Sequence, residues 1–114
     1  MELVQYIVMN ISLGMDKGKL VAQGAHAAVS VIDKVDNKTL SEWKNMGMKK
    51  IVLKVNSDKE LIEKFQEVKD AKLPAMLISD AGRTQIPAGS KTAFACGPID
   101  EKDGEKHFSE LKLL

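Results

Sequence analysis

The sequence predicts an α/β fold with a mixed, four-stranded sheet, and three observations lead to it. Four short runs of apolar and β-branched residues are typical of strands, at Val4–Met9, Lys50–Val55, Ala75–Ile78 and Thr92–Cys96. Helical patterns separate the first three runs, so right-handed crossovers should make those strands parallel. Only Asp80–Ser90, without a helical pattern, joins the last two runs. A turn-back is the simplest connection there, and it makes the last strand antiparallel.

Apolar residues at three- and four-residue spacing locate the helices. The longest such stripe runs from Leu20 to Val35, and it predicts the helix with the clearest apolar periodicity in the chain. Capping-box patterns predict two further helix starts, at Thr39–Glu42 and Ser57–Glu60. The chain ends with a polar helix from about Asp100, followed by an apolar end at residues 111–114.

Length and composition indicate a single globular domain over residues 1–114. The chain has 44% hydrophobic and 29% charged residues, and this length can bury one core without disulfides. Cys96 is the single cysteine and lies in an apolar run, so we expect a buried, inert thiol and a reducing compartment. No apolar run approaches the roughly 18 residues of a membrane span, and no basic stretch precedes an apolar one at the N-terminus. We therefore expect a cytoplasmic protein without a membrane partner.

The charge is unevenly distributed along the chain. The formal net charge is only +1, yet the first 55 residues carry 8 lysines against 5 acids, and the remaining residues carry 9 basic against 11 acidic side chains. This difference, +3 against −2, permits an anionic partner on one side of the molecule. An ordinary solvated surface would explain the charges equally well.

The topology predicts a functional site beyond the carboxyl ends of the parallel strands, where open α/β sheets bind ligands. Three segments converge there: the helix start with Lys17 and Lys19, the loop that begins at Asp80, and the start of the last strand near Thr92. The helix start follows Asp16, which is a suitable N-cap, and it could hold a phosphate. For the loop, a plain polar hairpin is the alternative, and Asp80 alone could equally be a turn-opening aspartate.

Several kinds of chemistry are not expected. Neither the Walker spacing nor a GxGxxG motif occurs, which argues against a nucleotide cofactor. His26 and His107 are the two histidines, and neither has a spacing that binds zinc, so we expect no metal. On the first helix, His26 shares a polar stripe with Lys19, Gln23 and Ser30, where a histidine is more often structural than catalytic.

Motifs along the whole chain match one known family. They are Met15–Lys19, Ala22–Gln23, His26–Val29, Lys50–Val55, Leu73–Pro74, Asp80–Ile86, Gly89–Ser90, Gly97–Pro98 and Leu111–Leu114. In these segments the sequence closely resembles the type II peptidyl-tRNA hydrolases. The resemblance implies a three-layer α/β/α sandwich on a four-stranded sheet, and hydrolysis of peptidyl-tRNA without a metal or cofactor. It also implies peptidyl-tRNA as the partner and favours a homodimer.

The resemblance further implies roles for individual residues. The catalytic positions it implicates are Lys19, Asp80, Thr84 and Thr92. For contacts with substrate and tRNA we predict Lys17, Gln23, His26, Arg83, Gln85 and Lys91. The chain departs from the family pattern after the first strand, where Asn10 and Ser12 stand in place of a common arginine and aspartate. Two other functions stay open from the residues: a non-catalytic RNA-binding adaptor and a small-molecule acyl hydrolase.

Overall fold

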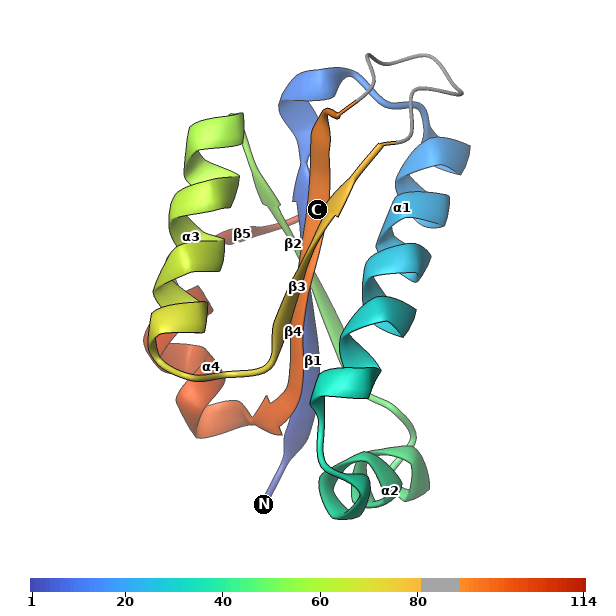
Figure 1. Ribbon diagram of the computed structural model, residues 1–114, viewed down its shortest axis with the longest axis vertical. Helices are drawn as coiled ribbons and strands as arrows, with labels where there is room; N and C mark the ends of the chain where they lie inside the picture. The colour runs from blue at the N-terminus through green and yellow to red at the C-terminus, as the bar shows by residue number, and fades with distance from the viewer. Residues whose placement is uncertain (81–88) are drawn as a thin grey trace.

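The computed structural model of the protein describes residues 1–80 and 89–114, which form a mixed sheet between two layers of helices (Figure 1). The strand order is β3-β4-β1-β2-β5. The strands are β1 (Leu3–Asn10), β2 (Lys50–Val55), β3 (Ala75–Ser79), β4 (Lys91–Asp100) and β5 (Lys112–Leu113).

Among the described residues, two α-helices lie on each face of the sheet, as their labels in Figure 1 show. They are α1 (Lys17–Ser30) and α2 (Asn37–Asn45) on one face, and α3 (Asp58–Asp70) and α4 (Glu101–Phe108) on the other. Short 3₁₀ segments, η1 (Ile11–Leu13) and η2 (Val31–Lys34), flank the region of α1. Within the described residues, each helix is too short or too polar to cross a lipid bilayer.

The predicted strand directions are confirmed, but the predicted number of strands is wrong. β1 pairs with β2 in parallel, and β4 runs antiparallel to both β1 and β3. Within the part of the chain that the structure describes, the sheet has five strands instead of four, because β5 adds to the free edge of β2, with Leu113 opposite Leu53. A two-residue strand held by backbone hydrogen bonds has too few side chains to show any periodicity.

Element boundaries differ from the sequence predictions by more than one residue in three places. The long helical pattern ends at Ser30 and continues as the 3₁₀ segment η2. Thr39 does not cap α2, because Asp36 lies one turn earlier and its side chain accepts a hydrogen bond from the Thr39 N–H at 2.9 Å. The strand predicted at Thr92–Cys96 is longer and covers Lys91–Asp100.

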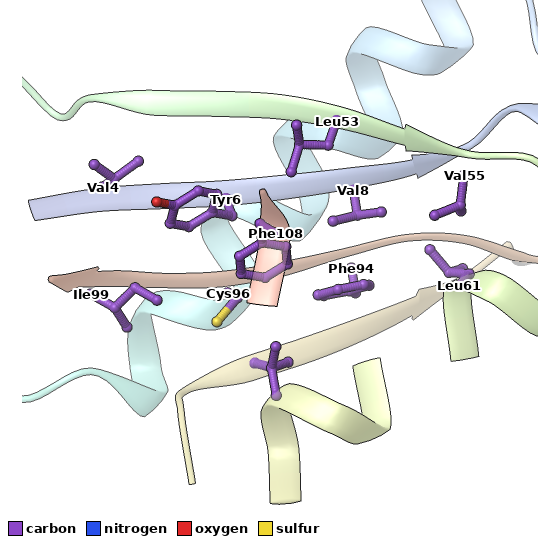
Figure 2. Close-up of a cluster of buried hydrophobic side chains, with 12 residues drawn as sticks. Val4, Tyr6, Val8, Leu53, Val55, Leu61, Phe94, Cys96, Ile99 and Phe108 are labelled. Atoms are coloured by element: carbon purple, nitrogen blue, oxygen red, sulfur yellow. The ribbon is translucent and has the colours of Figure 1, made fainter. Parts of the chain in front are cut away.

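The core on the α3 and α4 face is built around aromatic side chains (Figure 2). Tyr6 of β1 stacks on Phe108 of α4 with ring centroids 4.5 Å apart, and Phe94 of β4 lies beside them. Leu61 of α3 is fully buried in the same cluster. A second cluster, between the sheet and α1, is aliphatic and rich in alanine.

A group of charges joins α3 to the C-terminal region. Lys64 of α3 donates hydrogen bonds to the carbonyl oxygen of His107 and to the carboxylates of Glu67 and Glu110. For Glu67, burial raises the pKa, but hydrogen bonds from His107 and Lys64 outweigh it and lower the pKa below its usual value. The hydrogen bond from Lys64 likewise lowers the pKa of Glu110.

We expect these contacts to make stability depend on pH in the acidic range. Carboxylates with lowered folded-state pKa values stabilise the fold above their unfolded pKa of about 4.5, and this is lost as the pH falls through the folded values. Both carboxylates are partly exposed, so each should contribute at most about 1 kcal/mol. Between pH 6 and pH 3, the free energy of unfolding measured with urea should change less for Lys64→Met than for Lys59→Met, whose ion pair with Glu63 is exposed. An equal change in the free energy of unfolding in both variants would contradict the assignment of the pH dependence to the Lys64 contacts.

Candidate active site

The central contact of the site joins the start of α1 to the end of β3. The Lys19 Nζ lies 2.5 Å from the Asp80 Oδ1, and the two side chains are only 10% and 3% exposed. Asp16 caps α1 by accepting a hydrogen bond from the Lys19 N–H at 3.0 Å, which fixes the helix start. The Asp80 N–H donates to the Ser90 carbonyl at 2.8 Å, which fixes the chain just beyond β3. The backbone that carries each charged side chain is therefore fixed by a hydrogen bond of its own N–H group.

A second polar contact lies between α1 and β4. The Thr92 Oγ1 is 2.7 Å from the Gln23 Oε1, to which it donates, and 3.5 Å from the Ile78 carbonyl oxygen. Thr92 is fully buried, while Gln23 lies one helical turn after Lys19 on α1. The same helix thus presents an ammonium and an amide along one side, toward β3 and β4.

Further basic groups lie at this end of the sheet. Lys91, the first residue of β4, donates from its Nζ to the Ser79 Oγ at 2.7 Å. Lys17 is the first residue of α1 and is exposed. Both residues lie at the edge where Lys19 and Asp80 meet, so an anionic ligand there would meet positive charge.

The structure brings together four of the predicted site residues, namely Lys19, Gln23, Asp80 and Thr92. Lys17 and Lys91 lie at the same edge. His26 lies on the exposed face of α1. The three remaining predicted residues fall outside the described residues; they are Arg83, Thr84 and Gln85.

The described residues offer little to nucleophilic or metal chemistry. Cys96 is fully buried, and burial raises the pKa of its thiol to about 12, as expected for an inert side chain. Within residues 1–80 and 89–114, no three His, Cys, Asp or Glu side chains gather closely enough to hold a metal ion. The candidate site consists of an amine, a carboxylate, an amide and a hydroxyl.

One buried polar residue near the site was not among the predicted site residues. Asn10, at the end of β1, is fully buried and donates from its Nδ2 to the Asp58 carboxylate at 2.6 Å and to the Lys91 carbonyl at 3.0 Å. Its Oδ1 accepts hydrogen bonds from the N–H and the hydroxyl of Ser12. The signal in the sequence was an amide at the last position of a mostly apolar strand, where a buried polar group needs partners.

The geometry suits stabilisation of negative charge that develops during a reaction. An ammonium and a carboxylate that are shielded from water interact strongly with nearby charge, because the local dielectric is lower than in bulk solvent. An ammonium fixed in this way can stabilise an oxyanion, and a carboxylate can orient or deprotonate a water molecule. These are the requirements of ester hydrolysis.

The comparison with known proteins points to one family. The family model described as Peptidyl-tRNA hydrolase PTH2 matches residues 3–114. A Peptidyl-tRNA hydrolase of Methanococcus maripaludis (strain S2) is 48% identical over 113 residues, covering 96% of this chain and 97% of the relative. Another from Halobacterium salinarum (strain R1) is 43% identical over 110 residues, covering 96% and 98%.

These matches extend over nearly the full length of both chains, as the resemblance of the motifs had predicted. A third relative, the Peptidyl-tRNA hydrolase of Methanocaldococcus jannaschii, is 41% identical over 111 residues and covers 95% of this chain and 96% of its own length. The protein therefore belongs to the PTH2 family of peptidyl-tRNA hydrolases.

Proposed function

We propose that this protein hydrolyses the ester bond between peptide and tRNA in peptidyl-tRNA, and that Lys19 and Asp80 carry the chemistry. The shielded contact of 2.5 Å between these two side chains is the observation that supports this assignment most strongly. It places opposite charges at one point of the edge where open α/β sheets bind ligands. Membership of the family supplies the substrate class.

In the proposed reaction, a water molecule attacks the ester carbonyl carbon, and the carbonyl oxygen becomes anionic. The Lys19 ammonium stabilises this oxyanion or the departing ribose oxygen, and Asp80 orients the water or takes its proton. The Thr92 and Thr84 hydroxyls position water or substrate. Collapse of the intermediate breaks the bond to the ribose oxygen, which takes up a proton, so the products are free tRNA and a peptide carboxylate. An ordinary aspartate, with a pKa of about 4, is a weak base at neutral pH, which favours the electrostatic contribution.

The test is incubation of the purified protein with N-acetyl-aminoacyl-tRNA in EDTA. Release of free tRNA is expected, since none of the proposed steps uses a metal. Binding without release would instead identify a non-catalytic RNA-binding adaptor. Cleavage of small esters alone would identify a small-molecule acyl hydrolase. The family match favours neither of these two alternatives.

We expect tRNA binding to depend moderately on salt. Lys17 and Lys91, with Arg83 outside the described residues, are the proposed phosphate contacts, so the slope of log affinity against log salt should be about −2 to −4. Lys17→Ala should weaken binding and reduce the slope by about one. Lys102→Ala, an exposed lysine of α4, is the control and should change neither quantity. A slope near zero for the wild-type protein would argue against this surface.

We further propose that residues 1–114 act as one domain, in the cytoplasm, as a homodimer. An apolar groove of about 440 Å³ runs beside α1 and β2. Val21 and Leu114 line it and are 72% and 52% exposed, which is unusual for a surface facing water. A second copy of the chain would cover this apolar area.

Sedimentation measurements can test the dimer. Val21→Glu should shift the protein to a monomer, because a charge would be buried in the interface. Ile62→Glu changes another exposed apolar residue, on α3, and should leave the dimer intact. A monomeric wild-type protein at micromolar concentration would reject the homodimer while leaving the proposed reaction untouched.

A further inference from the structure

We propose that Asn10 is a positioning residue for the reaction. Its side-chain amide holds the irregular start of β4 in the conformation that turns the Thr92 hydroxyl toward Gln23. This inference rests on the proposed function, in which Thr92 positions water or substrate.

The pairing of β3 with β4 makes Thr92 an extra residue in the ladder. Ile78 is opposite Ala93, and Ser79 is opposite Lys91, so β4 advances by two residues where β3 advances by one. Such an insertion of one residue is a β-bulge. Bulges are common next to active sites, where they redirect a side chain.

The bulge changes the face of the sheet to which Thr92 points. Beyond it, Ala93 packs in the cluster with α1, and Phe94 packs in the cluster with α3 and α4. Regular alternation would put Thr92 on the same face as Phe94. Instead, the Thr92 hydroxyl lies 2.7 Å from Gln23 of α1, on the face that also carries Lys19. The position of this hydroxyl in the site therefore depends on the bulge.

Asn10 binds the bulge directly. Its Nδ2 donates to the Lys91 carbonyl at 3.0 Å, and this carbonyl belongs to the peptide bond immediately before Thr92. The same nitrogen donates to the Asp58 Oδ1 at 2.6 Å, and the Asn10 Oδ1 accepts from the Ser12 N–H at 3.1 Å and the Ser12 hydroxyl at 2.6 Å. These contacts fix the side chain against α3 and η1, so the side chain in turn limits the movement of the start of β4.

A side chain with an N–H donor is needed at this buried position. A carboxylate could accept from Ser12 but could not donate to the Lys91 carbonyl, and an apolar side chain would leave that carbonyl without its donor. Loss of the bond should allow the start of β4 to shift. Since a displacement of about 1 Å can cost up to about 100-fold in rate, small movements of Thr92 should be visible in turnover.

The first experiment compares Asn10→Ala with a matched control on the same strand. Gln5→Met removes another fully buried amide of β1, which donates to the Ala28 carbonyl at 3.0 Å. With N-acetyl-aminoacyl-tRNA as substrate, Asn10→Ala should lower kcat about tenfold or more and leave KM within about threefold. Gln5→Met should lower the melting temperature and leave kcat unchanged. An equal loss of kcat in both variants would overturn the positioning role.

A second variant isolates the bond to Lys91. In Asn10→Asp/Asp58→Asn the new amide at position 58 can donate to the new carboxylate at position 10, so that pair is restored, whereas the Lys91 carbonyl still loses its donor. This protein should fold and still show the low kcat. Wild-type kcat in this double variant would overturn the proposal, and so would unfolding of both Asn10 variants at the assay temperature.

The last measurement asks whether Asn10 acts through Thr92. If it does, Asn10→Ala should cause no further loss of kcat in a Thr92→Val background. Additive losses would overturn the proposal. The same assay separates this result from failure of the proposed function: a wild-type protein that releases no tRNA rejects the function, while an active wild type with active Asn10 variants rejects only the positioning role.

Discussion

Replacing Lys19 by methionine or Asp80 by asparagine is expected to lower the turnover of peptidyl-tRNA about 100-fold or more, with tRNA binding nearly unchanged. The reason is that both groups are shielded, lie 2.5 Å apart, and stabilise the developing charge in the proposed mechanism. Single-turnover measurements with N-acetyl-aminoacyl-tRNA would report the chemical step, and filter binding would report affinity. Wild-type turnover in both variants would refute the catalytic assignment.

Folding must be separated from catalysis in these variants. Removing one partner of a buried ion pair typically destabilises a protein by about 3–5 kcal/mol. The double variant Lys19→Met/Asp80→Asn removes both charges and should recover much of this stability. It should nevertheless remain inactive. Recovery of turnover together with stability would mean that the pair serves the fold and not the reaction.

The place of the candidate site could be predicted because topology determines where its residues meet. Helical patterns between the first three strands imply parallel strands, and the carboxyl ends of parallel strands meet at one edge. Lys19 and Asp80 are 61 residues apart in sequence. Lys19 nevertheless lies at the start of a predicted helix and Asp80 just after a predicted strand, and both positions are at that edge. The contact between them is therefore a consequence of the order of the elements.

The orientation of Thr92 could not be predicted in the same way. Alternation along β4 places it on the face of Phe94, and only the bulge against β3 turns it toward Gln23. A bulge depends on how two strands pair, and one strand alone carries no signal for it. The hydrogen bonds of Asn10 could not be predicted either, because its partners come from three other elements, η1, α3 and β4.

Local signals failed where two candidates competed or where the segment was short. Asp36 and Thr39 can both cap a helix, and Asp36 does so because it reaches the Thr39 N–H from one turn earlier. The strand β5 has two residues, Lys112 and Leu113, and forms because β2 presents an open edge to the C-terminal segment. Neither outcome follows from residue pattern alone.

Replacement of Gly97 by a residue with a side chain is expected to destabilise the sheet strongly. It lies in a second bulge of β4, where Ile99 pairs with Val4 and Cys96 pairs with Tyr6, so β4 advances by three residues against two. Its φ of +103° is a conformation that side chains rarely adopt. A Cβ at Gly97 would stand 2.7 Å from the Val4 carbonyl oxygen and 2.8 Å from the Ile99 nitrogen. Both contacts are with backbone, which cannot move aside as a flexible side chain could.

Gly97→Ala should therefore destabilise the protein by about 2–5 kcal/mol, the sum of the backbone conformation and the steric clash. Gly47→Ala is a matched control, because Gly47 has a φ of +102° and its Cβ would meet nothing within 4 Å. The control should cost only about 1–2 kcal/mol. In thermal unfolding, Gly97→Ala should melt about 10 °C below Gly47→Ala. Equal melting temperatures would mean that β1 and β4 can separate at this bulge without cost, against the close packing of the two backbones in the structure.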